Sequence, residues 1–254
     1  MDLLLKSRVA VITGGVSGIG LACVKALLAE GARALIVDRD IAGIEVAHQL
    51  SEQGHTVAFI QADITDETQV QRAMKYAQDA FGGIDTLIGC AGISGPVGKK
   101  AEDVTAEEWD RVMAVNVKGH FLVAKHSIPL LKQSKVATIV LIASDSALVA
   151  FEGMTPYCAS KGAALMLTKG LSVDYPELRV NCLCPGVVDT PMSRTDLGRP
   201  DGFAGTNLPV MQASQLAQHA AFLASPISSP INGTSIVADF GYLARSALPP
   251  LEFE

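Results

Sequence analysis

A tyrosine and a lysine lie four residues apart in the segment Tyr157-Cys158-Ala159-Ser160-Lys161. On a helix this spacing brings both side chains to one face. A phenol has a pKa near 10 and is a poor base at neutral pH. Because a neighbouring ammonium favours the phenolate, we expect Lys161 to lower the pKa of Tyr157 towards the range needed for proton exchange with a substrate. Taken alone, the same spacing is also typical of a pair on a solvated surface.

Two further polar residues accompany this pair. Ser144 follows the apolar run 136–143, which predicts a hydroxyl at the carboxyl end of a buried strand. In a parallel sheet that end is the ligand-binding side, and Tyr157 begins the next predicted helix from the same side. Asn116 is a polar residue within an apolar helical stretch, which a hydrogen-bonded core amide also explains. The sequence thus indicates a hydroxyl, a phenol and an ammonium around one reacting oxygen.

A glycine-rich loop, Thr13-Gly14-Gly15-Val16-Ser17-Gly18-Ile19-Gly20, joins a predicted strand to a predicted helix. Glycines let a pyrophosphate approach the backbone, and the helix N-terminus supplies free N–H groups and a favourable dipole. The spacing Gly-x-x-x-Gly-x-Gly differs from the commonest dinucleotide fingerprint, G-x-G-x-x-G. A turn without a ligand is the alternative interpretation, but the strand before the loop and the helix after it favour a dinucleotide site.

Acidic and small residues follow the next strands. Asp38 ends the second predicted strand, where a carboxylate accepts from both ribose hydroxyls and repels a 2′-phosphate. This predicts NAD rather than NADP, although Arg39 beside it is the kind of residue that accepts a 2′-phosphate. Asp63 is placed to accept from the adenine amino group, but a turn residue or helix N-cap would look the same. The small residues of Cys90-Ala91-Gly92 leave room for a cofactor against the backbone.

The elements that position these residues alternate strictly between strand and helix. This alternation predicts an α/β fold with a single-domain, Rossmann-type, doubly wound parallel sheet and helices on both faces, spanning residues 1–254. Predicted strands are 8–13, 34–38, 56–61, 86–90, 136–143, 179–184 and 235–239, and predicted helices are 19–30, 41–53, 66–81, 105–131, 160–175 and 214–224. Residues 192–209 show little periodicity, which is typical of a lid, a binding loop or a disordered segment. The tail, residues 248–254, shows no periodicity either.

Composition excludes several classes of protein. The 254 residues are 49% hydrophobic and 18% charged, so the chain is not disordered. A net charge of −6 argues against non-specific nucleic-acid binding. Neither a targeting segment nor a stretch of about 20 apolar residues for a membrane span is apparent. The five cysteines form neither a disulfide framework nor a paired zinc motif, so we expect a cytoplasmic protein with no metal site.

Taken together, these motifs resemble the short-chain dehydrogenase/reductase family, in its branch with subunits of about this length. The resemblance covers residues 8 to about 241. It implies an NAD-dependent oxidoreductase that interconverts a secondary alcohol and its ketone. By this resemblance, Tyr157 is the general acid/base, Ser144 orients the substrate oxygen, Lys161 holds the nicotinamide ribose and acidifies Tyr157, and Asn116 anchors a water that relays the proton.

The predicted binding residues fall into two groups. Those for the cofactor are Gly14, Ser17, Gly18, Ile19, Gly20, Asp38, Arg39, Ala62, Asp63, Ile64, Cys90, Ala91, Gly92, Tyr157, Lys161, Pro185, Gly186, Val188 and Thr190. Those for the substrate are Ser144, Ser146, Val149, Phe151, Met154, Tyr157, Val187 and Met192, with a substrate loop at about 187–210. Core packing is the alternative for the apolar members of the second group. Their character predicts a small secondary alcohol or ketone with an apolar body.

Three points depart from or extend the family pattern. Gly89-Cys90-Ala91-Gly92 stands where the family usually has Asn-Asn-Ala-Gly, and Asp239-Phe240-Gly241 stands for Asp-Gly-Gly. The uncharged helix 214–224 predicts burial, either in the interface of a homotetramer or homodimer or under the C-terminal tail. Arg194 and Arg199, the cations of the loop, either meet a substrate carboxylate or keep the loop in water.

An NADPH-dependent carbonyl reductase and a catalytically silent nucleotide-binding or scaffold protein are the alternative functions.

Overall fold

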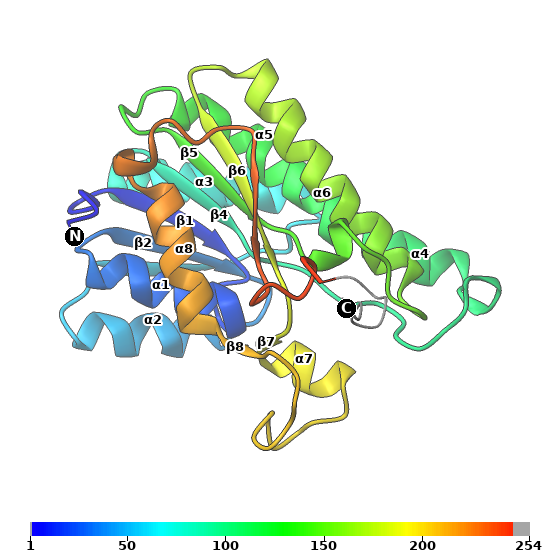
Figure 1. The fold of residues 1–254 in the computed structure, drawn as a ribbon. Helices are drawn as coiled ribbons and strands as arrows, with labels where there is room; N and C mark the ends of the chain where they lie inside the picture. The colour runs from blue at the N-terminus through cyan, green and yellow to red at the C-terminus, as the bar shows by residue number, and fades with distance from the viewer. Residues whose placement is uncertain (1, 246–254) are drawn as a thin grey trace, which may run out of the picture.

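The computed structural model describes residues 2–245 and contains a parallel sheet of seven strands (Figure 1). The strand order is β3-β2-β1-β4-β5-β6-β9, and every neighbouring pair is parallel. The strands are β1 (Val9–Thr13), β2 (Arg33–Asp38), β3 (Val57–Gln61), β4 (Thr86–Gly89), β5 (Thr138–Ile142), β6 (Arg179–Pro185) and β9 (Ser235–Ala238). The predicted doubly wound sheet is confirmed. The predicted tail, residues 248–254, lies outside the described residues.

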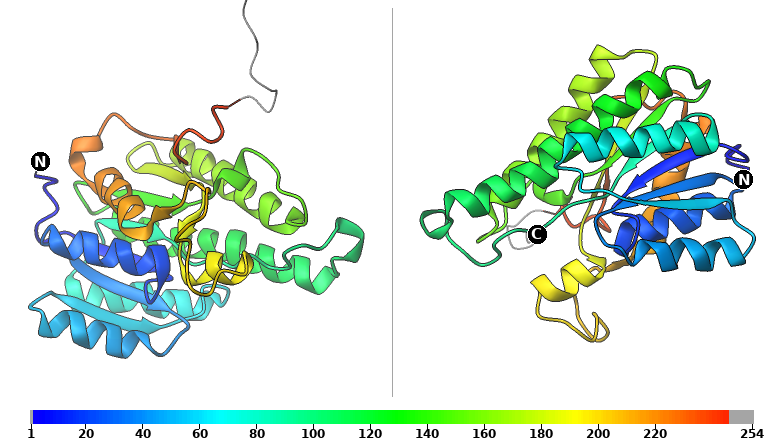
Figure 2. Two further views of the ribbon diagram at one scale, coloured as in Figure 1. Left: turned by 60° about the horizontal axis from the view of Figure 1, so that its bottom comes forward. Right: turned by 180° about the vertical axis from the view of Figure 1, so that it is seen from behind.

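Helices cover both faces of the sheet, as Figures 1 and 2 show from three sides. On one face lie α1, α2 and α8, and on the other α3, α5 and α6. The helices are α1 (Gly18–Ala29), α2 (Gly43–Glu52), α3 (Glu67–Phe81), α4 (Ala106–Met113), α5 (His120–Leu131), α6 (Thr155–Asp174), α7 (Pro191–Asp196) and α8 (Ala213–Ala224). Within residues 2–245, we find no helix long and apolar enough to cross a membrane.

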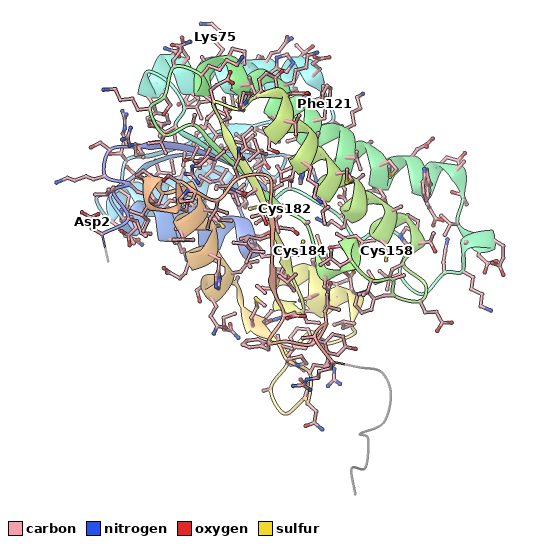
Figure 3. The ribbon with its side chains drawn as sticks, turned by 45° about the horizontal axis from the view of Figure 1, so that its top comes forward. Asp2, Lys75, Phe121, Cys158, Cys182 and Cys184 are labelled. Carbon is pink, nitrogen blue, oxygen red and sulfur yellow. The ribbon has the colours of Figure 1, made fainter. Side chains whose placement is uncertain are left out.

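The apolar strands account for this layering. Every residue of β1, β4 and β5 is buried, because helices pack on both sides of these central strands. Alternate side chains of each strand enter two separate hydrophobic clusters. Ile12 and Ile36 pack with α1 and α8, whereas Val11 and Leu35 pack with α3 and α5. All five cysteines are free thiols, and Cys182 and Cys184 are buried in the central strand β6 (Figure 3).

The structure corrects several predicted boundaries. The long predicted helix 105–131 is two helices, α4 and α5, joined by a π-helical turn at Ala114–Gly119. Helix α6 begins at Thr155 rather than at residue 160, with Pro156 in its first turn, so Tyr157 and Lys161 both belong to it. Helix α7 was not predicted, because its six residues, four of them polar, show no apolar period. The short pair β7 (Val188–Asp189) and β8 (Met211–Gln212) was not predicted either.

One face of the uncharged helix α8 is buried by α1, while burial of its other face in a subunit interface or under the tail, which lies outside the described residues, stays a prediction. Leu216, Ala217, Ala220 and Ala221 are buried on the face that packs on α1 within the same chain. The small alanines allow the two helices to approach closely. The opposite face carries Gln215, Gln218 and His219, which are exposed and neutral.

Candidate active site

The loops that follow the carboxyl ends of the strands carry the predicted site residues. The order of strands reverses between β1 and β4, which lie side by side at the centre of the sheet. In open α/β sheets such a switch point leaves a crevice for a ligand. Two adjoining cavities lie here, of about 320 and 260 Å³, and they share lining residues such as Ile19, Gly92 and Thr190.

The glycine-rich loop after β1 has no room for side chains. A Cβ on Gly14 would lie 2.8 Å from the Cα of Ala91, and Gly14 has a φ of +66°. A Cβ on Gly20 would lie 2.0 Å from the carbonyl oxygen of Gly14. Ser17, the N-cap of α1, makes no side-chain capping bond within the described structure. The first N–H groups of α1 therefore stay available to an anion, and the bare loop fits the pyrophosphate of a dinucleotide.

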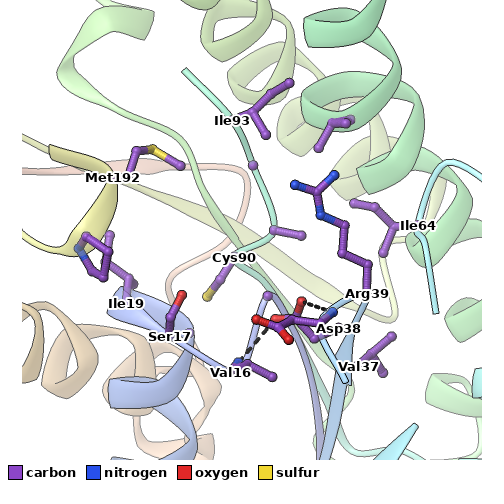
Figure 4. Close-up of a pocket in the computed structure, with 18 of the residues that line it drawn as sticks. Val16, Ser17, Ile19, Val37, Asp38, Arg39, Ile64, Cys90, Ile93 and Met192 are labelled. Atoms are coloured by element: carbon purple, nitrogen blue, oxygen red, sulfur yellow. Dashed lines mark hydrogen bonds between the residues drawn. The ribbon is translucent and has the colours of Figure 1, made fainter. Parts of the chain in front are cut away.

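Asp38 lies on the floor of the first cavity (Figure 4). Its Oδ2 accepts from the N–H of Val16 at 3.2 Å, and its Oδ1 accepts from the N–H of Asp40 at 3.1 Å. These bonds hold the carboxylate beside the glycine-rich loop. A carboxylate accepts about four hydrogen bonds, so Asp38 retains capacity for two hydroxyl donors. The side chain of Arg39 lines the same cavity and extends away from Asp38 (Figure 4).

Asp63 forms a turn. Its Oδ1 accepts from both the N–H and the hydroxyl of Thr65 at 2.8 Å, whereas the N-cap of α3 is Asp66. The N-cap interpretation of Asp63 is therefore wrong and the turn interpretation is confirmed; a contact with adenine stays a prediction. Cys90, Ala91 and Gly92 all line the first cavity. A Cβ on Gly92 would lie 3.3 Å from Oδ1 of Asn116, so this segment packs tightly on its far side.

The second cavity collects the predicted substrate residues. Its lining includes Ser144, Ser146, Phe151, Met154, Tyr157, Val187 and Met192. Val149 does not line it and is 41% exposed. The remaining predicted cofactor residues also lie here: Lys161, Pro185, Gly186, Val188 and Thr190. The structure thus brings every binding residue of the two predicted groups except Val149 to one cavity or the other, while their roles stay predictions.

Burial dominates the electrostatics of the Tyr157 and Lys161 pair. The Lys161 Nζ atom lies 5.4 Å from the centre of the Tyr157 ring and donates to the carbonyl of Ile142, the last residue of β5, at 2.9 Å. Burial raises the pKa of Tyr157 to about 12 and lowers the pKa of Lys161 to about 8. The pKa of the tyrosine therefore moves opposite to the predicted direction, because desolvation disfavours the phenolate.

Ser144 lies directly after β5, as predicted, and caps a short 3₁₀ turn. Its hydroxyl donates to Oδ1 of Asp145 at 2.8 Å and also lies 3.2 Å from Oγ of Ser146. The Ser144 hydroxyl is close enough to the phenol of Tyr157 to oppose the upward shift of its pKa. The two hydroxyl groups thus face the same part of the second cavity. A substrate oxygen placed between them would accept from the phenol, and would accept from Ser144 once that hydroxyl turns away from Asp145.

Asn116 lies behind the cavities, in the π-helical turn, and is fully buried. Its Nδ2 group donates to the carbonyl of Ile93 at 2.9 Å and to Oγ of Ser160 at 3.0 Å. Its Oδ1 accepts from the N–H of Ile93 at 2.9 Å. This amide therefore ties the loop after β4 to the first turns of α6. Both amide donors are used, and one lone pair of Oδ1 is left to accept from a water.

Replacing Asn116 by alanine is expected to destabilise the fold by about 3 kcal/mol, because it leaves the buried N–H and C=O of Ile93 without partners. For a domain of this size, that corresponds to a fall in Tm of roughly 6–12 °C in thermal unfolding followed by circular dichroism. Asn181→Ala is a matched control, since that buried amide bonds to Ile231 and Thr234 far from the site. It should lose similar stability but keep turnover. An unchanged Tm in Asn116→Ala would contradict the assigned network.

The substrate loop is ordered by bonds that the sequence did not predict. Thr190 caps α7 by accepting from the N–H of Ser193, and its methyl group lies against Gly18 of the glycine-rich loop. Arg194 donates to both carboxylate oxygens of Asp189, at 2.6 and 3.1 Å. This ion pair within the chain was not predicted, and the two roles proposed for Arg194 stay predictions.

Sequence reasoning missed several lining residues. They are Val16, Val37, Asp40 and Val115 in the first cavity, Val97, Ile142, Ala143 and Asp145 in the second, and Ile93 in both, whereas Pro191, Ser193, Asp196 and Leu197 fall within the predicted substrate loop but were not singled out. The sequence could have indicated Asp145 as a lining residue, because it is next to Ser144. No feature of the sequence indicated Asp196 in particular, because only the fold of α7 turns it towards the site.

Comparison with known proteins places the chain among oxidoreductases. The family model described as short chain dehydrogenase matches residues 8–198. The chain is 37% identical to 2-(R)-hydroxypropyl-CoM dehydrogenase of Xanthobacter autotrophicus, over 94% of this chain and 99% of the relative. It is 31% identical to cyclopentanol dehydrogenase of Comamonas sp., over 95% and 99%. The structure of 3-ketoacyl-(acyl-carrier-protein) reductase from Brucella melitensis complexed with NADH superposes with a TM-score of 0.85 at 34% identity, over 93% and 98%.

Proposed function

The chain belongs to the short-chain dehydrogenase family, and from that premise we propose that it is an NAD-dependent enzyme that interconverts a secondary alcohol and its ketone. One observation carries the proposal: Ser144, Tyr157 and Lys161 meet at the carboxyl end of β5, beside the glycine-rich loop. The proposed unit is a single domain spanning residues 1–254, with its substrate loop at about 187–210.

Each side chain has a distinct proposed task. The nicotinamide cofactor, when bound, accepts or donates the hydride. Ser144 orients the substrate oxygen. Tyr157 takes the hydroxyl proton during oxidation and returns it during reduction. Lys161 holds the ribose beside the nicotinamide, and Asn116 offers its free Oδ1 lone pair to a water that carries the proton to solvent.

The pKa of Tyr157 bears on the direction of the reaction. With a pKa raised by burial to about 12, the phenol holds its proton more tightly than an ordinary tyrosine does. A protonated phenol is ready to act as the acid in ketone reduction. Alcohol oxidation needs the pKa to fall, and positive charge near the phenol lowers it: that of Lys161 and of the oxidised cofactor. Lys161, with a pKa of about 8, keeps most of its charge at pH 7.

The position of Asp38 supports NAD over NADP. Its carboxylate borders the first cavity beside the N–H of Val16, where a 2′-phosphate would meet a like charge. An NADPH-dependent carbonyl reductase is the second candidate, and Arg39 in the same cavity favours it. A catalytically silent nucleotide-binding or scaffold protein is the candidate of another class. The assembled Ser144, Tyr157 and Lys161 argue against that last candidate.

The proposed substrate is a small secondary alcohol or ketone with an apolar body. Phe151, Met154, Val187 and Met192 supply an apolar lining. The similarity to a cyclopentanol dehydrogenase agrees with a cyclic alcohol.

We further propose a cytoplasmic homo-oligomer, a tetramer or a dimer. Large apolar side chains exposed on α5 and α6 support it: Phe121 (Figure 3) at 46%, Met166 at 61% and Val173 at 77%.

Absorbance at 340 nm tests the proposal directly. With NAD and a panel of secondary alcohols, cyclopentanol among them, we expect reduction of NAD, and NADP should be at least about tenfold poorer in kcat/KM, given the carboxylate of Asp38. Equal or better use of NADP would favour the carbonyl reductase. Failure to bind either cofactor, measured by calorimetry, would contradict both enzymatic candidates.

A further inference from the structure

The second cavity has an unusual set of charges for an enzyme pocket. Three charged side chains line it: Asp145, Lys161 and Asp196. Lys161 is 5% exposed and already donates to the carbonyl of Ile142. The ammonium of Lys161 thus already donates to a protein carbonyl, whereas the carboxylates of Asp145 and Asp196 border the space left for a substrate.

Asp145 offers an acceptor that the protein does not use. Its side chain is 8% exposed, and its Oδ1 accepts from the hydroxyl of Ser144 and the N–H of Ser146, each at 2.8 Å. Among residues 2–245, no group donates to its Oδ2 atom. This oxygen is not enclosed by the protein, so it can accept a hydrogen bond from a molecule bound in the second cavity.

Asp196 borders the cavity from a different element. It lies near the end of α7, whereas Asp145 follows β5. The hydroxyl of Ser94 donates to Oδ1 of Asp196 at 2.9 Å, and this bond joins the loop after β4 to α7. Both carboxylates act on the phenol of Tyr157, since each raises its pKa. The reacting oxygen would therefore lie within the field of two negative charges.

Other cations lie near the second cavity but not on its walls. Arg194 is paired with both oxygens of Asp189. Arg111 lines the neighbouring groove, which is also lined by Asp196 and by Glu108, the partner of Lys99. Residues 246–254 contain no lysine or arginine, so the rest of the sequence supplies no cation there. In the part of the chain that the structure describes, an anionic substituent in the second cavity would find no unpaired cation on its walls other than Lys161.

We propose that the second cavity selects its alcohol by charge, accepting uncharged and amine-bearing secondary alcohols and rejecting those that carry a carboxylate, sulfonate or phosphate. Asp196 is the specificity-determining residue, and Oδ2 of Asp145 accepts a hydrogen bond from the substrate. This inference rests on the proposed function, because it concerns the cavity in which we place the reaction. It goes beyond that function by naming the class of alcohol that the second cavity accepts.

Three alcohols of one ring size test the proposal: cyclohexanol, 4-aminocyclohexanol and 4-hydroxycyclohexanecarboxylate. At pH 7 and low ionic strength, kcat/KM for the carboxylate should lie at least about tenfold below that for cyclohexanol, and the amine should match or exceed cyclohexanol. Raising the ionic strength should narrow the difference, because salt screens the carboxylates. A carboxylate used as well as cyclohexanol would overturn the proposal.

Two variants distinguish the effect of the charge at Asp196 from the effect of the net charge of the protein. Asp196→Asn keeps an acceptor for Ser94 and removes one charge, and it should raise the ratio of carboxylate to cyclohexanol turnover about fivefold. Asp110→Asn removes the same charge from an exposed position of α4 that does not line the cavity. It should leave the ratio within about twofold, given solvent screening. Equal shifts in both variants would overturn the assignment of Asp196.

A binding measurement distinguishes failure of this inference from failure of the proposed function. Ligand-observed NMR measures the affinity of the same three alcohols for the whole chain, whether or not they are turned over. Binding that ranks the amine and cyclohexanol above the carboxylate, without turnover, would support charge selection and contradict the proposed reaction. Turnover with no ranking by charge would support the reaction and contradict charge selection. Absence of binding by all three would overturn the inference.

Discussion

Replacing Tyr157 by phenylalanine is expected to lower kcat at least about a thousandfold while leaving the affinity for NADH within about threefold. The substitution removes one oxygen and keeps the ring, which packs beside Lys161. It deletes the only group of the proposed set whose proton is transferred to or from the substrate oxygen. Steady-state absorbance at 340 nm measures the turnover, and quenching of protein fluorescence measures the binding of NADH.

The control for Tyr157→Phe is Tyr76→Phe. Tyr76 lies on α3, is 40% exposed and lines neither cavity, so the same chemical change should leave kcat unaltered. Activity of Tyr157→Phe within tenfold of the parent would remove Tyr157 from the mechanism. Loss of NADH binding together with activity would instead indicate a structural role for the hydroxyl.

Replacing Asp38 by alanine is expected to lower the preference for NAD over NADP about a hundredfold in kcat/KM. The variant loses an acceptor for the ribose hydroxyls and also a charge that repels a 2′-phosphate. Two charges about 4 Å apart near a protein surface interact by about 4 kcal/mol, and about two-thirds of that energy, left after screening, corresponds to this hundredfold ratio. Initial rates with each cofactor at limiting concentration give both values.

Two further variants separate charge from shape at Asp38. Asp38→Asn keeps an oxygen that can accept from Val16 or Asp40 but removes the charge, so it should give most of the change in preference. Asp40→Ala removes the same charge from the same loop, and its carboxylate instead accepts from the N–H of Ala42. It should leave the ratio within about threefold, since it does not hold the glycine-rich loop. A ratio unchanged in Asp38→Ala would show that Asp38 does not select the cofactor.

The parallel sheet was predictable because its signals are local. Each central strand is a short apolar run that needs helices on both faces, and the alternation of strands and helices leaves few ways to arrange them. The boundaries failed where local signals conflict. Pro156 was not recognised as a first-turn residue of α6, and no periodic pattern distinguishes a π-helical turn at Ala114–Gly119 from a continuous helix.

The positions of the site residues were predictable for a related reason. Residues that end parallel strands meet at one edge of the sheet, so Gly14, Asp38 and Ser144 converge without any knowledge of side-chain contacts. Asp196 escaped prediction because it reaches the cavity only through the fold of α7 and its bond from Ser94. The ion pair of Arg194 was not predicted because its partner, Asp189, lies in β7, a strand of two residues that leaves no pattern in the sequence.

The sheet and the meeting of the glycine-rich loop with the candidate reacting side chains follow from the sequence alone, because spacing along the chain is enough to place residues on a strand end or a helix face. The electrostatics of the site do not. Burial raises the pKa of Tyr157 although a lysine lies beside it, and two carboxylates from separate elements border the substrate space. Desolvation and the field of distant charges depend on all the elements that enclose a group, and no local spacing contains that information.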